Sequence, residues 1–387
     1  MITLADKRDC CGCYACYNIC PQQCISMQVD EEGFWYPVVD LDECTDCSLC
    51  EKACSILNKN VTDNHPVAYA CINKDDNIRQ QSSSGGLFTV IAEKVIANNG
   101  VVFGAGFDGG FNVVHSWTDK LDGVSNFRGS KYVQSCIGDT YKEVLDFLKQ
   151  GRQVVFSGTP CQIAGLRSYL GKDYEALICL DIICHGVPSP KVWQRYKLHT
   201  EEIYQAKAKR ITFRHKNCGW KLYSVSFSFD NDTEYSQKLT ENIFMQGFLH
   251  NLYLRPSCYA CSFKTLNRQS DITLADFWGI ENILPSFDDN KGTSLVMVNT
   301  QKGAEIFSSV VDKISYEKVD INLAILYNTS AVKSVDYNPK RNQFFQELSG
   351  SIDISQLIAK YTKVSFLKKV YMKVRTLLSR IKKNILS

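Results

Sequence analysis

Apolar and polar positions follow two different periods along most of this chain. Between about residues 66 and 345, apolar runs of strand length alternate with longer segments in which apolar residues recur every three or four positions, as on one face of a helix. Strands are expected at 67–72, 101–107, 113–117, 154–157, 176–184, 211–214, 223–229, 271–275 and 294–300. Helices are expected at 86–98, 139–150, 160–170, 190–202, 241–250 and 303–313. This alternation predicts an α+β or α/β domain built around a mixed sheet.

The first 60 residues follow a different pattern. Apolar side chains occupy every second position from Ile25 to Val29 and again from Phe34 to Val38, on either side of a Glu-Glu-Gly turn. Strict alternation across a short turn predicts a β-hairpin. The polar, turn-rich stretch 57–64 then marks a linker to the larger domain.

The end of the chain is basic and amphipathic. From Tyr361 onward there is no acidic residue, and apolar residues alternate with Lys363, Lys368, Lys369, Lys373, Arg375, Arg380, Lys382 and Lys383. Such a helix can lie on an anionic membrane surface. It can equally dock its apolar face on the main domain, and the pattern leaves both interpretations open.

Cysteine is unusually frequent, with 18 among 387 residues. Two runs share the spacing C-x-x-C-x-x-C-x-x-x-C, and Pro21 follows the first: Cys10, Cys13, Cys16 and Cys20, then Cys44, Cys47, Cys50 and Cys54. This duplicated spacing is typical of a ferredoxin with two [4Fe–4S] clusters, in which the fourth cysteine of each run binds the other cluster. A zinc site or a disulfide framework is the alternative, but neither favours two identical triplets with a trailing cysteine.

The crossed pattern assigns four cysteines to each predicted cluster. One set is Cys10, Cys13, Cys16 and Cys54, and the other is Cys20, Cys44, Cys47 and Cys50. Six cysteines remain outside all predicted ligand sets, and burial as small apolar residues explains most of them: Cys11, Cys24, Cys71, Cys136, Cys179 and Cys218.

Four further cysteines follow expected strands or stand in a C-x-x-C pair. They are Cys161, Cys184, Cys258 and Cys261. Loops at the carboxyl edge of an α/β sheet are where ligands gather, so these thiols could hold a third cluster. In the alternative, Cys161 and Cys184 are small buried residues and only the C-x-x-C pair binds something, zinc or a disulfide.

Several separate motifs resemble one family, in order along the chain from about residue 67 to residue 300. They are Ser-Ser-Ser-Gly-Gly at 82–86, Arg-Gly-Ser-Lys-Tyr-Val-Gln-Ser at 128–135, Phe-Ser-Gly-Thr-Pro-Cys-Gln at 156–162, Asp-Ile-Ile-Cys-His-Gly-Val-Pro-Ser at 181–189 and Ala-Asp-Phe-Trp-Gly at 275–279. These strings resemble the coenzyme F420 hydrogenase/dehydrogenase β-subunit family. The resemblance implies a flavin and a [4Fe–4S] cluster in this domain, with Cys161, Cys184, Cys258 and Cys261 as the cluster ligands.

The resemblance also implies that the loop before the helix at 86–98 holds the diphosphate of FAD. The candidate contacts are Ser83, Ser84, Gly85 and Gly86, because small residues let backbone N–H groups approach a phosphate, with Lys131 as a source of positive charge. A serine cap on a buried helix and a solvated surface lysine are the simpler interpretations. His185, directly after Cys184, is a candidate for donating to a cluster sulfur or moving a proton to the flavin.

Composition narrows the class of protein. A formal net charge of +3 gives no indication of nucleic acid binding, and no run of 18 apolar residues predicts a membrane-spanning helix. Iron–sulfur thiolates need a reducing compartment, so we expect a cytoplasmic protein, with peripheral membrane contact through the tail as the open alternative. Three parts are expected: a ferredoxin-type domain at 1–60, the flavin and cluster domain at 61–345, and the tail at 346–387.

The predicted function is that of an iron–sulfur flavoprotein oxidoreductase. Electrons would pass between the two N-terminal clusters, the third cluster and FAD, which would exchange a hydride with an organic substrate. That substrate would be an F420-like coenzyme, or a small molecule or sugar precursor in polysaccharide biosynthesis, and the partner a redox donor or acceptor protein. The alternatives are an electron-carrier subunit that feeds a partner reductase and a non-redox assembly protein that keeps its clusters only for folding.

Overall fold

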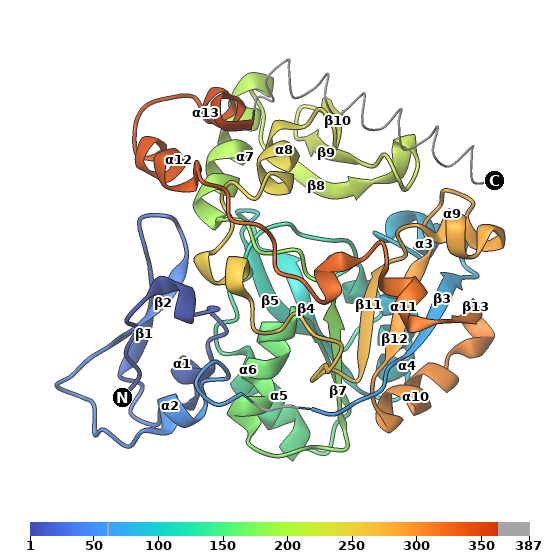
Figure 1. Ribbon diagram of the computed structural model, residues 1–387, viewed down its shortest axis with the longest axis horizontal. Helices are drawn as coiled ribbons and strands as arrows, with labels where there is room; N and C mark the ends of the chain where they lie inside the picture. The colour runs from blue at the N-terminus through green and yellow to red at the C-terminus, as the bar shows by residue number, and fades with distance from the viewer. Residues whose placement is uncertain (60–61, 363–387) are drawn as a thin grey trace.

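The computed structural model describes residues 1–59 and 62–362, and most of the predicted basic tail therefore lies outside the described residues. A large mixed sheet forms the centre, with a small N-terminal unit against one side and a second, smaller sheet above it (Figure 1). In the described part of the chain, none of the helices has the length and apolar composition needed to cross a membrane.

The central sheet has eight strands in the order β13-β3-β12-β11-β7-β6-β4-β5. Parallel pairing joins β11, β7, β6 and β4, and the outer strands pair antiparallel, so the sheet is mixed, as predicted. Its strands are β3 (Val67–Asn73), β4 (Val101–Phe107), β5 (Val113–Thr118), β6 (Val154–Gly158), β7 (Leu177–Ile182), β11 (Ile272–Asp276), β12 (Ser294–Val298) and β13 (Ile314–Val319).

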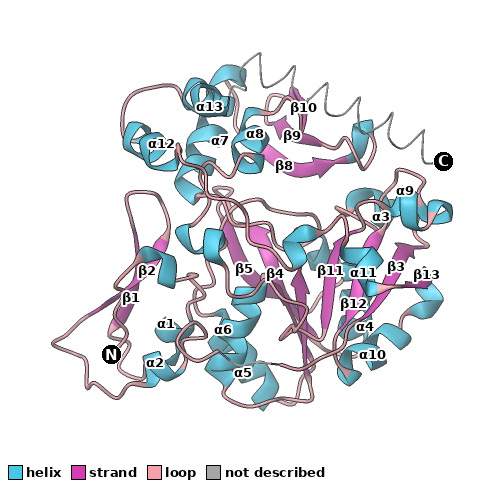
Figure 2. Ribbon diagram, viewed as in Figure 1, coloured by secondary structure: helices cyan, strands magenta, loops and turns pink. Residues whose placement is uncertain are grey.

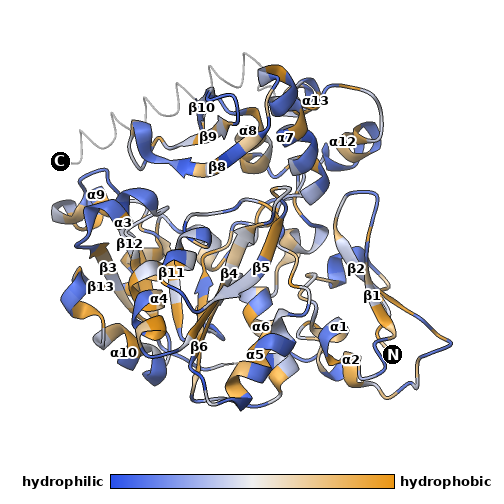
Figure 3. Ribbon diagram, turned by 180° about the vertical axis from the view of Figure 1, so that it is seen from behind, coloured by the Kyte–Doolittle hydropathy of each residue, from blue (hydrophilic) through white to orange (hydrophobic). Residues whose placement is uncertain are grey.

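Helices cover both faces of this sheet (Figure 2). The face formed by residues such as Val102 and Val155 packs against α4 (Leu87–Ala97) and α10 (Gln301–Ser308). Phe103 and Phe156 point to the other face, against α5 (Thr140–Lys149) and α6 (Pro160–Leu170). Strand β6 accordingly appears almost entirely hydrophobic in Figure 3, as expected for a strand covered on both sides. Three short helices lie at the edges: α3 (Asp76–Gln81), α9 (Ile280–Ile283) and α11 (Ile321–Ile325).

A second sheet of three antiparallel strands corrects one expectation. The predicted strands at 211–214 and 223–229 do form, but they pair in the order β10-β9-β8, separate from the central sheet. An aromatic core around Trp193 and Phe244 holds this sheet against four helices. The elements are β8 (Ala208–His215), β9 (Ser224–Phe229), β10 (Glu234–Lys238), α7 (Pro190–Tyr204), α8 (Ile243–Leu249), α12 (Arg341–Leu348) and α13 (Ile354–Thr362).

The N-terminal unit contains the predicted hairpin, with β1 (Ile25–Val29) antiparallel to β2 (Trp35–Val39). Two short helices, α1 (Ala15–Ile19) and α2 (Leu49–Lys52), carry cysteines of the two runs or follow them closely. The hairpin turn contacts the smaller sheet's helices, where Lys191 Nζ donates to Glu31 O over 2.8 Å and Arg341 pairs with Glu32.

A buried histidine in β5 makes stability sensitive to mild acid. His115 Nε2 lies 3.0 Å from Ser157 O and Nδ1 lies 2.6 Å from Ser135 Oγ; since a carbonyl only accepts, Nε2 carries the hydrogen. Burial lowers the pKa of His115 to about 4, so the unfolded chain binds a proton more readily than the folded one below about pH 6.5. Stability contributed by neutral His115 is therefore complete above pH 6.5 and falls by about 1.4 kcal/mol per pH unit toward pH 4.

Urea unfolding midpoints between pH 7.5 and 4.5 test this, with His115→Gln as the comparison. The wild type should lose stability more steeply than the variant over this interval. Equal slopes would show that His115 is not the group responsible.

Candidate functional site

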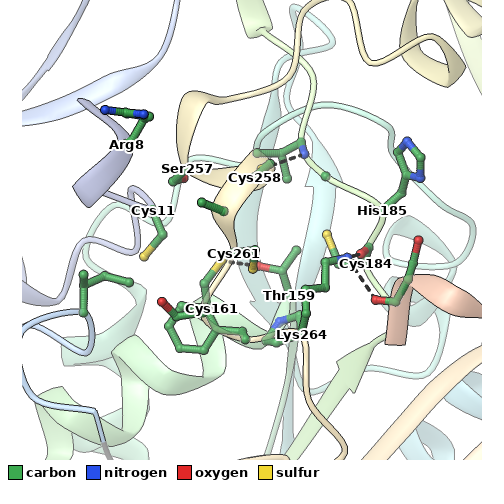
Figure 4. Close-up of a pocket in the computed structure, with 18 of the residues that line it drawn as sticks. Arg8, Cys11, Thr159, Cys161, Cys184, His185, Ser257, Cys258, Cys261 and Lys264 are labelled. Atoms are coloured by element: carbon green, nitrogen blue, oxygen red, sulfur yellow. Dashed lines mark hydrogen bonds between the residues drawn. The ribbon is translucent and has the colours of Figure 1, made fainter. Parts of the chain in front are cut away.

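A single cavity brings together the four later cysteines. It measures about 370 Å³ and is lined by Cys161, Cys184, Cys258 and Cys261, which come from three separate stretches of the chain. Figure 4 shows these residues around a common space, with His185 at one end and Cys11 at the other. We call these four residues the cavity set.

Strand topology explains why two of them meet. Strands β6 and β7 are parallel neighbours, so the segments that follow them leave the same edge of the sheet. Cys161 stands in the first turn of α6, which a Thr159–Gln162 capping box starts just after β6, and Cys184 follows β7 by two residues. Cys258 and Cys261 reach the same edge from the segment after α8, where Val187 N lies 3.4 Å from Cys258 Sγ.

The N-terminal cysteines also divide as the spacing predicts. Cys16 lies near Cys13, Cys10 and Cys54, since burial and then the charges of these three thiols raise the pKa of Cys16 well above its usual value. We call Cys10, Cys13, Cys16 and Cys54 the inner set. The outer set of Cys20, Cys44, Cys47 and Cys50 lines a second cavity together with Cys24, whose Sγ is 3.3 Å from Cys20 Sγ.

Cys11, which the ligand spacing leaves over, lies between the inner set and the cavity set. Its thiol bonds to Cys13 and to Cys161, and these contacts together with burial raise the pKa of Cys11 well above its usual value. The same contact lowers the pKa of Cys161 to about 7. The two sets are therefore adjacent across the boundary between the N-terminal unit and the central sheet. Sequence spacing carries no signal for this position.

The larger cavity fits an anionic cluster with thiolate ligands. Lys264 Nζ donates to Cys184 O, and buried Arg268 donates to Ala331 O over 3.2 Å, so two cations line the wall beside the thiols. Within the ranges 1–59 and 62–362, no group of three or more His, Cys, Asp or Glu side chains is arranged to hold a metal ion. A four-iron cluster keeps its ligands farther apart than one ion does, because each thiolate binds a different iron.

The outer set is tighter. Its cavity measures about 20 Å³, room for about one water molecule, so a cluster fits only if the loop that carries Cys44 and exposed Cys47 moves outward. The surrounding segment is strongly acidic: residues 9–51 contain no Lys or Arg and nine acidic residues, which are Asp9, Asp30, Glu31, Glu32, Asp40, Asp42, Glu43, Asp46 and Glu51.

The predicted phosphate loop uses its polar groups within the protein. Ser84 Oγ donates to Thr293 O over 2.8 Å, Gly85 N donates to Ser294 Oγ over 2.9 Å, and Ser83 Oγ accepts from Ser130 N over 2.7 Å. Gly85 is explained by packing, since a Cβ there would lie 2.3 Å from Cys71 O. Gly86 has φ of 88°, a left-handed conformation that suits glycine, and caps α4.

The two other candidate side chains are also bonded within the protein. Lys131 Nζ donates to Asn126 O over 2.9 Å and to Arg128 O over 3.2 Å, and burial lowers the pKa of Lys131 to about 7. His185 lines the cavity, where its Nε2 lies 2.7 Å from Asn251 Oδ1, and burial lowers its pKa. Neither contact tests the role predicted for these residues.

A buried ion pair that the sequence did not predict joins the two sheets. Arg214 of β8 forms a two-pronged contact with Asp276 of β11, with N–O distances of 2.7 and 2.9 Å. Trp220 Nε1 donates to Asp276 over 2.8 Å, and the ring of Trp220 stacks on Trp278 at 5.0 Å. Trp278 thus packs in the core, the more ordinary of the two roles open to it.

A close contact at Gly165 sets the position of the inner set. A Cβ on Gly165, in α6, would lie 2.8 Å from Cys13 Cβ and 3.0 Å from Tyr141 Oη. Gly165→Ala should therefore push the N-terminal unit away from α6 and destabilise the protein by about 1–3 kcal/mol. Urea unfolding under anaerobic conditions measures this. Gly109→Ala, where nothing lies within 4 Å, is the control and should change stability by less than about 0.5 kcal/mol.

Known proteins resemble the two parts of the chain separately. An uncharacterised ferredoxin from Methanocaldococcus jannaschii is 33% identical over 51 residues, which is 13% of this chain and 65% of that protein. The chain thus spans slightly under two thirds of this relative. A structure of the F420-reducing [NiFe] hydrogenase complex from Methanosarcina barkeri aligns with 78% of this chain and 91% of its own chain at 16% identity, with a TM-score of 0.45.

The family comparison covers the cavity set. Residues 151–323 match the family described as the C terminus of the coenzyme F420 hydrogenase/dehydrogenase beta chain, and all four cysteines of the cavity lie within this range. The resemblance recognised in the sequence motifs is confirmed. This part of the chain, from residue 151 to residue 323, belongs to the coenzyme F420 hydrogenase/dehydrogenase β-subunit family.

Proposed function

We propose that the protein is an iron–sulfur oxidoreductase in which three [4Fe–4S] clusters conduct electrons across the boundary between its N-terminal unit and its central sheet. The inner and outer sets would each hold one cluster, and the cavity set would hold the third. The convergence of Cys161, Cys184, Cys258 and Cys261 on one cavity, with Cys11 of the N-terminal unit at its wall, is the observation that carries this proposal.

The order of the sets supports a path for electrons. Exposed Cys47 places the outer set at the surface, where a redox donor or acceptor protein can approach. Cys54 of the inner set lies close enough to Cys50 of the outer set for the charge of Cys50 to affect the pKa of Cys54, which burial chiefly raises. Cys11 then links the inner set to the cavity set. Clusters, when bound, supply one-electron transfer, and the protein supplies their spacing and their surroundings.

We further propose FAD as the cofactor that takes the electrons onward. This rests on the family to which residues 151–323 belong and on the motifs at 82–86 and 128–135. To bind a phosphate through Ser84 Oγ or Gly85 N, the loop would have to release its bonds to Thr293 or Ser294. Hydride exchange with an F420-like coenzyme, a small molecule or a sugar precursor is the reaction that such a cofactor would support.

Anaerobic purification followed by iron, sulfide and flavin assays tests the proposal. Three clusters correspond to about twelve irons per chain, and one flavin should accompany them. About eight irons would show that the cavity set is empty. About twelve irons without flavin would indicate an electron-carrier subunit, and an iron-free, colourless protein would reject the proposal altogether.

A further inference from the structure

One buried arginine lacks the partner that the others have. Five arginines are buried in the part of the chain that the structure describes, and four of them pair with a carboxylate: Arg79 with Asp289, Arg214 with Asp276, Arg268 with Asp181 and Arg341 with Glu32. Arg255, the fifth, is fully buried and has no carboxylate partner among the described residues. A buried charge needs a counter-charge, because burial removes the water that would otherwise stabilise it.

The partners of Arg255 come from the N-terminal unit. Its Nε donates to Cys10 O over 2.8 Å, and its Nη2 donates to Trp35 O over 3.0 Å and approaches Cys10 Sγ at 3.5 Å. The guanidinium carbon lies 4.2 Å from the centre of the Tyr36 ring. Gly12 packs so closely that a Cβ there would be 2.9 Å from Arg255 Cζ. Carbonyls and a ring face can accept these bonds, but only the thiol of Cys10 can become an anion at neutral pH without loss of a buried phenol proton.

The same residue also belongs to the cavity set's loop. Arg255 N donates to Val187 O over 3.0 Å, and Arg255 O accepts from Cys258 N over 2.9 Å. The positive charge of Arg255 therefore lies between the inner set and the cavity set, close to Cys10 on one side and three residues from Cys258 on the other. No hydrogen bond from Arg255 reaches Cys20, Cys44, Cys47 or Cys50 within the described chain.

We propose that Arg255 is the counter-cation of the inner cluster and raises its reduction potential relative to the outer cluster. This inference rests on the proposed function, since it assumes a cluster bound to Cys10. Reduction adds one negative charge to a cluster, and a fixed positive charge in a dry site stabilises the reduced form. Arg255 would thereby favour the passage of an electron inward, from the outer cluster toward the cavity. It is a positioning and potential-setting residue, and it takes no part in bond making.

Redox titration followed by low-temperature EPR tests this with Arg255→Met, which removes the charge, and Arg255→Lys, which keeps it. In Arg255→Met one cluster should become at least about tenfold harder to reduce, equal to about 59 mV for one electron, with the other potentials little changed. Arg255→Lys should restore most of this difference. Arg79→Met is the control: it also removes a buried arginine, but one that Asp289 neutralises on the far side of the sheet, and it should leave all potentials unchanged (Figure 1).

The remaining outcomes are also decisive. Full iron content with equal potentials in Arg255→Met and the wild type would overturn the role of Arg255 and leave the proposed function intact. If Arg255→Met loses about four irons, Arg255→Lys decides: retention of all irons shows that the charge holds the cluster, and loss shows a purely structural role, which contradicts the proposal. A wild type without any iron-based signal would instead reject the proposed function itself.

Discussion

The double variant Cys258→Ala, Cys261→Ala is expected to lose about four of about twelve irons per chain and to keep the other eight. Both side chains line the cavity, and alanine at both positions removes two of its four thiolates. A cubane held by only two thiolates loses its protein ligands on one side. The inner and outer sets draw all their ligands from residues 10–54, so their clusters should remain. Iron and sulfide assays, with EPR of the reduced protein, measure the loss.

Matched controls come from buried cysteines of the same sheet. Cys71 in β3 and Cys179 in β7 are buried, and neither lines the cavity. Cys71→Ala and Cys179→Ala remove a thiol of the same kind and should keep all the irons, although each leaves a small void in the core. An unchanged iron content in the double variant would show that the cavity set holds no cluster. Loss of all irons would show that the N-terminal clusters cannot assemble alone.

Much of the fold could be predicted because its signals are local. Strand β4 and helix α6 have the predicted bounds, 101–107 and 160–170, since a continuous apolar run and a proline after a capping threonine are both readable from a few residues. Strands β10 and β13 went unpredicted. Both are mostly polar and exposed along their length, so neither has a strong apolar period. The separate pairing of β8 with β9 depends on the aromatic core around Trp193, which no local pattern contains.

The candidate site divides in the same way. Ligand spacing within a few residues identified the inner and outer sets, and the strand ends predicted that Cys161 and Cys184 would lie together. Cys11 and Arg255 could not be found in this way, because their importance comes from contacts between residues more than 100 positions apart. The two residues stand where the N-terminal unit meets the central sheet, and local sequence carries no information about that contact.

The second large effect concerns the ion pair between the two sheets. Asp276→Asn keeps the shape of the side chain but leaves the guanidinium of Arg214 buried beside a neutral amide. Removing one partner of a buried ion pair costs about 3–5 kcal/mol, because the remaining charge has neither water nor a counter-charge. The smaller sheet should therefore loosen from β11, and the loop at Ser83, whose carbonyl accepts from Arg214 over 3.1 Å, should loosen with it. The midpoint of urea unfolding under anaerobic conditions measures this loss.

Two further variants separate charge from shape. Asp76→Asn breaks the exposed pair with Lys291 at 2.8 Å and should cost at most about 1 kcal/mol, because water already screens that contact. The double variant Arg214→Met, Asp276→Leu removes both charges and should recover much of the stability that Asp276→Asn loses, since an apolar pair has no unpaired charge to bury. If the double variant is no more stable than Asp276→Asn, the hydrogen bonds to Trp220, Tyr132 and Ser83 hold the sheets together, and the charges contribute little.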